Sequence, residues 1–196
     1  MSVGLIGNGG LGREIKSYLD RIGISSKFFL SDEFHNDSSD AQKISEFDIE
    51  KYSALVCIAN PIDRENVINS LPKGIKYFTF IHPSAQIYTE QPIGEGSIIC
   101  PNVVITSNVK IGNHVILNIN TTVGHDTYVG NFCTVNPNTS IAGNCKIEDS
   151  VFIGSSSAIK EKSRIVKGTT VGMGAVVVNS IETKGTYVGI PAKQKH

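Results

Sequence analysis

Residues 111–146 read IGNHVI-LNINTT-VGHDTY-VGNFCT-VNPNTS-IAGNCK, six successive hexapeptides that each begin with Ile, Leu or Val. The same position is aliphatic in every hexapeptide from Ile81 to Val177, seventeen in succession. These three residue types make up 50 of the 196 residues, so a random run of this length has a probability of roughly 10⁻¹⁰. The periodicity therefore reflects the fold rather than the composition.

An apolar residue at every sixth position is typical of a parallel β-helix built from hexapeptides. Each hexapeptide supplies a short strand and a corner, three of them close a triangular coil of 18 residues, and coils stack at about 4.8 Å. Seventeen hexapeptides predict between five and six coils. The residue four places after each aliphatic is mostly small or β-branched, which predicts that it points into the narrow interior.

The corners of such a coil are tight, and tight turns require positive φ values, which glycine and asparagine adopt most easily. The sequence therefore predicts positive φ at the following corner residues: Gly94, Gly112, Gly130, Gly154, Gly172, Asn102, Asn108 and Asn120.

Composition narrows the possible partners and location. The chain has 18 basic and 18 acidic residues, a formal net charge of zero, which argues against nucleic acid or an anionic membrane as partner. No run of 18 apolar residues and no signal peptide are present, so we expect a cytoplasmic protein without a membrane span. The four cysteines have no C-x-x-C spacing, and Cys133 and Cys145 fall on the inward position of the repeat. We expect buried structural thiols.

The first 80 residues follow a different pattern. Apolar residues 3–6 run into Gly7-Asn8-Gly9-Gly10-Leu11-Gly12, which fits G-x-G-x-x-G, and a helical pattern follows. The expected elements are strands at 3–6, 27–30, 54–59 and 77–80, helices at 13–22 and 64–71, and an exposed loop at 35–43. This order predicts a small Rossmann-like α/β domain with parallel strands at residues 1–80, followed by an all-β domain with a C-terminal tail at residues 81–196.

The glycine loop fits a phosphate-binding turn, in which backbone N–H groups at a helix N-terminus face the phosphates. Asp32 lies twenty positions past Gly12, after the second strand, where such folds contact a ribose or base. The domain is too short for a second mononucleotide half, so a ligand with one nucleoside and a pyrophosphate is favoured over NAD or FAD. The alternative is that the glycines only permit a tight strand-to-helix turn.

His125 is the candidate catalytic residue of the repeat region. It lies between the corner residue Gly124 and the carboxylate of Asp126, and imidazole is the usual general base near neutral pH. Asn118 is expected to add a polar group from the neighbouring face. The alternative is a solvated surface histidine. No Gly-x-Ser-x-Gly motif and no metal-ligand spacing are present, so serine-hydrolase and metal chemistry are set aside.

Taken together, the motifs make the chain similar to the NeuD/PglD group of sugar acyltransferases. They are the hexapeptide run, the short glycine-loop domain, the segments Ile81-His82-Pro83-Ser84-Ala85 and Gly124-His125-Asp126, and the closing segment Gly185-Thr186-Tyr187-Val188-Gly189-Ile190-Pro191-Ala192-Lys193. The resemblance covers nearly the whole chain. It implies a left-handed β-helix, a homotrimer and acetyl-CoA as co-substrate. The implied acceptor is the 4-amino group of a UDP- or dTDP-linked 4-amino-4,6-dideoxy sugar.

The resemblance also implies roles for individual residues. His125 matches the base that takes a proton from the attacking amine, and Asp126 stands where close relatives often have Glu. The residues matched to the nucleotide-sugar pocket are Gly7, Asn8, Gly9, Gly10, Gly12, Asp32, Asn60 and Arg64. The residues matched to a CoA groove between subunits are Thr134, Ala142, Gly143, Ser155, Met173 and Gly174. The implied mechanism is direct acyl transfer in a ternary complex.

Three other functions remain open. A sugar O-acetyltransferase of the sialic acid type would use a hydroxyl acceptor. Serine or maltose acetyltransferase-like chemistry occurs in relatives that lack such a glycine-loop domain, and a non-catalytic β-helix scaffold would not turn over acetyl-CoA. A triangular solenoid cannot enclose a deep pocket within one chain, which favours a threefold oligomer with grooves between subunits.

Overall fold

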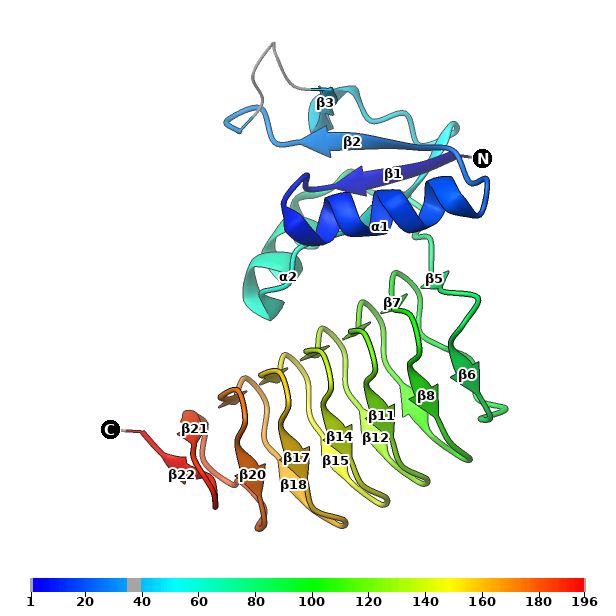
Figure 1. Ribbon diagram of the computed structural model, residues 1–196. Coiled ribbons are helices and arrows are strands. Elements are labelled where there is room, and N and C mark those ends of the chain that lie inside the picture. Colours follow the sequence, from blue (N-terminus) through cyan, green and yellow to red (C-terminus); the bar gives the residue numbers. More distant parts are fainter. Residues whose placement is uncertain (1, 35–39, 196) are drawn as a thin grey trace. The chain divides into compact units, whose positions relative to one another are not determined.

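The computed structural model describes residues 2–34 and 40–195, and the described chain divides into two compact units, Met1–Thr79 and Phe80–His196 (Figure 1). The first unit has both helices and strands, whereas the second consists of strands joined by turns. No helix within the described residues is long and apolar enough to cross a membrane.

In the first unit, over residues 2–34 and 40–79, four parallel strands form one sheet in the order β3-β2-β1-β4. Its elements are β1 (Ser2–Ile6), α1 (Gly10–Arg21), β2 (Ser26–Leu30), β3 (Ala41–Lys43), the 3₁₀ helix η1 (Ile44–Glu46), β4 (Tyr52–Val56) and α2 (Pro61–Ser70). The predicted parallel β-α-β arrangement is confirmed.

Adjacent phenylalanines in β2 face opposite sides of this sheet, as alternation along a strand requires. Phe28 lies beside α1, whereas Phe29 is buried against Phe47 and Tyr52, at ring-centroid distances of 4.8 and 5.1 Å. Val67 and Ile68 of α2 pack against the cluster that contains Phe29, Phe47 and Tyr52. The sheet therefore has apolar cover on both faces, as parallel sheets need.

Two sequence predictions for this unit are wrong. Residues 77–80 do not form a strand of its sheet: Tyr77 makes one isolated bridge to Ala54, and Phe80 begins the first strand of the second unit. Part of the predicted loop at 35–43 is the edge strand β3. Within the described part of the chain it pairs only with β2, and it lacks the apolar alternation of a half-buried strand. Residues 35–39 lie outside the described residues.

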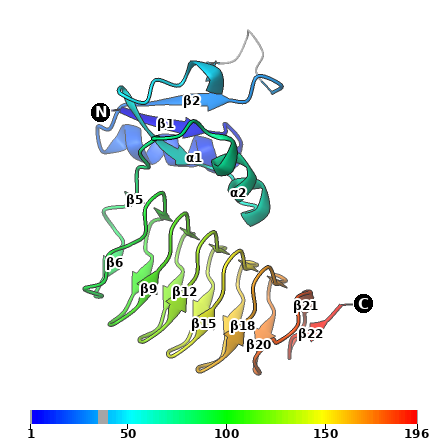
Figure 2. The same ribbon diagram turned by 180° about the vertical axis from the view of Figure 1, so that it is seen from behind.

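In the second unit, over residues 80–195, the strands form three sheets of eight, six and four strands, which make the three faces of a solenoid (Figures 1 and 2). From β5 to β20, paired strand residues lie 18 positions apart, as in Leu117↔Val135, Val123↔Ile141 and Val129↔Ile147, whereas the last parallel pairing, of β19 with β21, has an offset of 16. The predicted 18-residue coil of three hexapeptides is confirmed.

The eight-stranded sheet contains β5 (Phe80–Ile81), β7 (Ile98–Ile99), β10 (Ile116–Leu117), β13 (Thr134–Val135), β16 (Phe152–Ile153), β19 (Thr170–Val171), β21 (Thr186–Val188) and β22 (Lys193–Gln194). The six-stranded sheet contains β6 (Gln86–Ile87), β8 (Val104–Ile105), β11 (Thr122–Val123), β14 (Ser140–Ile141), β17 (Ala158–Ile159) and β20 (Val176–Val177). The four-stranded sheet contains β9 (Lys110–Ile111), β12 (Tyr128–Val129), β15 (Lys146–Ile147) and β18 (Arg164–Ile165). All pairings are parallel except that of β21 with β22.

The repeated aliphatics fill the interior of the solenoid. They are buried from Ile99 to Val177, and so is the second inward position four residues after each of them. Two threonines at that second position donate their hydroxyls to carbonyls inside the coil: Thr127 donates to the carbonyl of Ala142 at 3.0 Å, and Thr139 to that of Gly154 at 3.1 Å. Only the first coil departs from the pattern, since Ile81, Ile87 and Ile93 are not fully buried.

Every sixth residue from Gly96 to Gly174 has a positive φ, the geometry that closes each corner. These residues are Gly96, Asn102, Asn108, His114, Asn120, Asp126, Phe132, Asn138, Asn144, Ser150, Ser156, Lys162, Gly168 and Gly174. The prediction is confirmed for its three asparagines.

The prediction is wrong for its five glycines, Gly94, Gly112, Gly130, Gly154 and Gly172, which do not have positive φ. They lie two residues earlier in the repeat, where the next coil passes very close. A Cβ on Gly112 would lie 2.7 Å from the Asn131 side chain and 2.8 Å from its backbone nitrogen. These glycines therefore serve close packing between coils rather than an unusual backbone conformation.

Candidate active site

His125 lies at the corner between the six-stranded and four-stranded sheets. We call residues 106–108, 124–126, 142–144 and 160–162, which stack at this edge, the histidine corner. The Nδ1 atom of His125 is 2.8 Å from Oδ2 of Asp126, and the two side chains are 59% and 44% exposed. The predicted imidazole–carboxylate pair is therefore present on an open edge of the solenoid.

Asp126 is fixed by the preceding coil. Its φ is +59°, its backbone N–H donates to the carbonyl of Ser107 at 3.1 Å, and its Oδ1 accepts from Nδ2 of Asn108 at 2.7 Å. The hydrogen bond from His125 and then that from Asn108 lower the pKa of Asp126 below its ordinary value. Asp126 is thus a carboxylate at neutral pH, with each oxygen bound to a different partner.

This pairing decides how the imidazole is oriented. A carboxylate only accepts hydrogen bonds, so Nδ1 of His125 carries the proton that it donates to Asp126. In the neutral ring, Nε2 then has the free lone pair. That side of the ring lies over Gly143 in the next coil, where a Cβ would be 2.7 Å from Nε2. Nε2 is therefore the atom available to accept a proton from a substrate.

Asn118 is not beside His125. It lies between β10 and β11, at the edge of the eight-stranded and six-stranded sheets, which we call the methionine corner and define as residues 118–120, 136–138, 154–156 and 172–174. Its Oδ1 accepts from the backbone N–H of Ile119 at 2.8 Å. The two corners lie on either side of the six-stranded sheet, because residues 118–121 precede β11 and residues 124–127 follow it. Among the described residues, no hydrogen bond joins Asn118 to His125.

The predicted CoA residues divide between these two corners. Ala142 and Gly143 belong to the histidine corner, whereas Ser155, Met173 and Gly174 belong to the methionine corner. Met173 is 79% exposed. The sixth residue, Thr134, lies in β13 of the eight-stranded sheet and is buried.

A cavity of about 560 Å³ lies at the carboxyl ends of β1, β2 and β4 in the first unit, a size typical of small-ligand sites. It is lined by Gly7, Asn8, Gly9, Gly10, Leu11, Leu30, Phe34, Cys57, Ile58 and Ala59. The predicted glycine loop therefore forms one wall. Gly12 does not line the cavity. A Cβ on Gly12 would collide with the carbonyl oxygen of Gly7, so this glycine allows α1 to pack closely on the loop.

The three polar residues predicted around the nucleotide are used differently. Asp32 accepts from the Ser45 hydroxyl at 3.1 Å, and Asn60 caps α2 by accepting from the backbone N–H groups of Ile62 and Asp63. Arg64 is buried, and its Nη1 donates to the carbonyls of Ile58 and Ala59 at 2.5 and 3.1 Å. Arg64 therefore stabilises the backbone of Ile58 and Ala59, which line the cavity.

Sequence reasoning missed the apolar wall of this cavity, above all Phe34, which is 72% exposed. Its side chain lines the cavity together with Leu30 and Ile58. The available signal was position, since all three follow or end a strand of the parallel sheet, where ligands of such folds bind.

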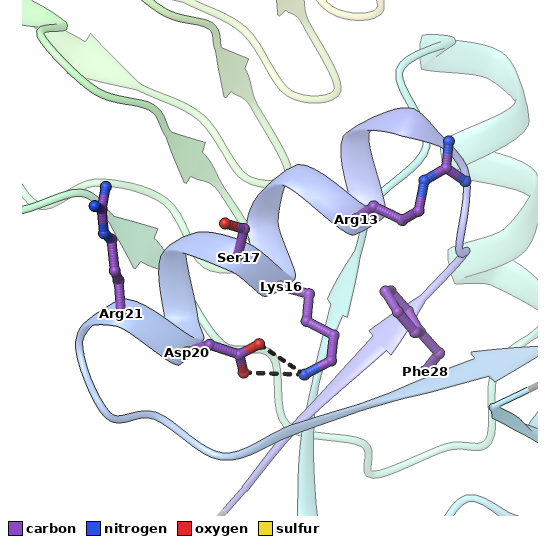
Figure 3. Close-up of a pocket in the computed structure, with 6 residues that line it drawn as sticks. All are labelled: Arg13, Lys16, Ser17, Asp20, Arg21 and Phe28. Atoms are coloured by element: carbon purple, nitrogen blue, oxygen red, sulfur yellow. Dashed lines mark hydrogen bonds and ion pairs between the residues drawn. The ribbon is translucent and has the colours of Figure 1, made fainter.

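A second hollow, of about 620 Å³, runs along α1 and Phe28 (Figure 3). Lys16 and Asp20 form an ion pair of 2.9 Å there, while Arg13 extends toward the start of the helix and donates to the carbonyl of Asn8 at 2.8 Å. Arg13 thus ties the glycine loop to the helix. The hollow itself does not include the residues of the glycine-loop cavity.

The cysteines are buried thiols, as predicted, and burial raises the pKa of Cys145. Among residues 2–34 and 40–195, no group of three His, Cys, Asp or Glu side chains is arranged to hold a metal ion.

No protein-family model matches the sequence. Among solved structures, WeeI from Acinetobacter baumannii AYE is 31% identical with a TM-score of 0.89, and the match covers 100% of both chains. The chain belongs to the sugar N-acetyltransferases of the left-handed β-helix, hexapeptide-repeat superfamily. This sugar N-acetyltransferase is therefore an enzyme with a left-handed solenoid, and the scaffold alternative is set aside.

Two further structures carry ligands. PerB from Caulobacter crescentus, in complex with CoA and GDP-perosamine, is 25% identical with a TM-score of 0.91 over 100% of this chain and 98% of PerB. The acetyltransferase domain of PglB from Neisseria gonorrhoeae FA1090, in complex with acetyl coenzyme A, is 25% identical with a TM-score of 0.88 over 99% of this chain and 98% of that domain. The nucleotide of the PerB complex is GDP, neither of the two that the sequence resemblance implied.

Proposed function

We propose that this enzyme transfers the acetyl group of acetyl-CoA to the 4-amino group of a UDP- or dTDP-linked 4-amino-4,6-dideoxy sugar, with His125 as general base. The observation that supports this proposal most is the His125–Asp126 pair. Its 2.8 Å contact holds Nδ1, and Nε2 is left beside Gly143 on an open edge. An imidazole oriented in this way by a carboxylate is suited to accept a proton near neutral pH.

The reaction follows from this geometry. Nε2 of His125 takes a proton from the sugar amine as its nitrogen attacks the thioester carbonyl carbon. We assign the backbone N–H of Gly143, on the residue over which the imidazole lies, as a donor to the resulting oxyanion. The C–S bond then breaks, and the CoA thiolate takes the proton back from the imidazolium. The imidazolium is stabilised throughout by the carboxylate of Asp126.

A homotrimer would complete the CoA site. The histidine and methionine corners flank one flat sheet, so the CoA residues of a single chain do not face one another across a groove. A threefold ring brings the histidine corner of one subunit toward the methionine corner of the next and closes three equivalent grooves. The exposed Met173 then becomes a groove wall.

The cavity of the first unit is the proposed nucleotide site. Its glycine loop precedes α1, whose N-terminus has no side-chain cap, so backbone N–H groups are available to the pyrophosphate. Phe34 offers a ring face to the base at the apolar wall. We place the enzyme in the cytoplasm, where its free thiols stay reduced.

The test is thiol release from acetyl-CoA with UDP-, dTDP- and GDP-linked 4-amino sugars and with sialic acid. His125→Ala is compared with His82→Ala, a matched control because His82 also lies at a turn of the solenoid with its Nδ1 2.9 Å from a hydroxyl, that of Ser84. We expect turnover with a UDP or dTDP amino sugar, lost by at least 100-fold in His125→Ala only. Turnover only with sialic acid would move the acceptor to a hydroxyl, and a fully active His125→Ala trimer would exclude His125 as base.

A further inference from the structure

Asn108 is the positive-φ residue that precedes Asp126 by one coil in the histidine corner. Its φ is +55°, and its Nδ2 donates to Oδ1 of Asp126 at 2.7 Å. The equivalent asparagine bonds along the edge of the methionine corner are longer: 3.2 Å from Asn102, one coil before that corner, to Asn120, and 3.1 Å from Asn120 to Asn138. A shorter bond is expected where the acceptor is a charged carboxylate rather than an amide.

The bond from Asn108 removes the rotational freedom that Asp126 would otherwise have. With His125 alone as partner, a carboxylate that is 44% exposed can turn about its Cβ–Cγ bond and exchange its oxygens with water. Because Asn108 holds Oδ1 while Nδ1 of His125 meets Oδ2, the carboxylate plane is fixed at both ends.

The backbone of Asp126 depends on the same coil. Its N–H donates to the carbonyl of Ser107, the residue next to Asn108, at 3.1 Å. Both the position and the plane of the carboxylate are therefore set by residues 107 and 108, which lie 18 positions away from the pair that they orient.

We infer that Asn108 is a positioning residue for catalysis: it holds Asp126 so that Asp126 fixes the tautomer and direction of the His125 imidazole. The inference rests on the proposed role of His125 as base. Asn108, Asp126 and His125 form one hydrogen-bonded chain across two coils, in which only His125 touches the reacting atoms.

The test uses Asn108→Gly, because glycine keeps the positive φ without strain and removes only the side chain. Asn102→Gly is the matched control, since it removes an asparagine of the same conformation and the same kind of ladder bond from the other corner. For Asn108→Gly we expect kcat to fall about ten-fold with unchanged KM for both substrates. This factor is at the low end of the effect of losing a hydrogen bond to a charged group, because water can reach Asp126 and replace part of the bond. For Asn102→Gly we expect kcat within two-fold of the native enzyme.

Asn108→Asp is a second variant that keeps the volume and replaces the donor with another carboxylate, so its kcat should fall further. A spectroscopic readout separates positioning from folding. In long-range ¹H–¹⁵N spectra, His125 should be mainly the Nδ1–H tautomer in the native enzyme and in Asn102→Gly, and a mixture of tautomers in Asn108→Gly.

His125→Ala separates a failure of the proposed base from a failure of the positioning role of Asn108. If His125→Ala is inactive while Asn108→Gly matches Asn102→Gly in both kcat and tautomer, the positioning role is overturned and the base stands. If His125→Ala is active, the base and the positioning role are both overturned.

Discussion

Gly143→Ala should impair catalysis with little effect on folding. The added Cβ would lie 2.7 Å from Nε2 and 2.8 Å from Cε1 of His125, whereas ordinary Cβ contacts begin near 3.4 Å. The imidazole must therefore move by about 0.7 Å or more. Misplacement of a catalytic group on this scale can cost about 100-fold in rate, so we expect kcat to fall by roughly that factor.

Folding should be almost unaffected, because the ring is 59% exposed and can swing toward solvent. A substitution at such a site typically changes the free energy of unfolding by less than about 1 kcal/mol. The assay is thiol release at saturating acetyl-CoA and acceptor, with Tm measured on the same samples.

A double variant tests whether Gly143→Ala acts through the imidazole. If Gly143→Ala acts only through the ring, adding it to His125→Ala should cause no further loss of kcat. A Gly143→Ala enzyme with native kcat and a raised KM for acetyl-CoA would show instead that the glycine matters for co-substrate contact and not for the histidine.

Three other predictions concern stability and the nucleotide. Lys162 has a φ of +61°, so Lys162→Asn should raise stability by about 0.5–1 kcal/mol in urea unfolding, whereas Lys160→Asn, without positive φ, should not. Hydrogen bonds from Arg164 lower the pKa of Glu148, so this pair stabilises the fold above the ordinary carboxyl pKa of 4.5 and loses that effect as the pH falls through the lowered value. Glu148→Gln should accordingly lower Tm at pH 7, and the difference should close in acid. Phe34→Ala should raise KM for the nucleotide sugar roughly ten-fold and leave KM for acetyl-CoA unchanged, since stacking of a base on an aromatic ring contributes about 1–3 kcal/mol.

The sequence was sufficient to predict the solenoid, because the repeated aliphatics are the side chains that are buried. An aliphatic at each sixth position predicts which side chains point inward. Three such hexapeptides, one for each side of a triangular coil, give the coil of 18 residues. The His125–Asp126 pair was also predictable, since the two residues are adjacent. The parallel sheet of the first unit followed from apolar runs separated by helical patterns.

Other features depend on distances that residue types do not encode. The corner positions with positive φ include Phe132 and Lys162, residue types that rarely adopt this conformation, so composition could not identify them. Gly112 is required by the backbone one coil away, not by its own turn. The family resemblance matches Arg64 to a polar position around the nucleotide pocket, yet its guanidinium donates to two carbonyls of its own unit.

The coil register restricts how this protein can change in length. The paired residues from β5 to β20 lie 18 positions apart, so a one-residue insertion between Asn108 and His125 would move His125 and Asp126 out of register with Ser107 and Asn108. An insertion of one whole coil, by contrast, restores every column beyond it. We therefore expect the solenoid to tolerate gains and losses in steps of 18 residues, and to tolerate smaller ones only as loops that leave the coil at a corner.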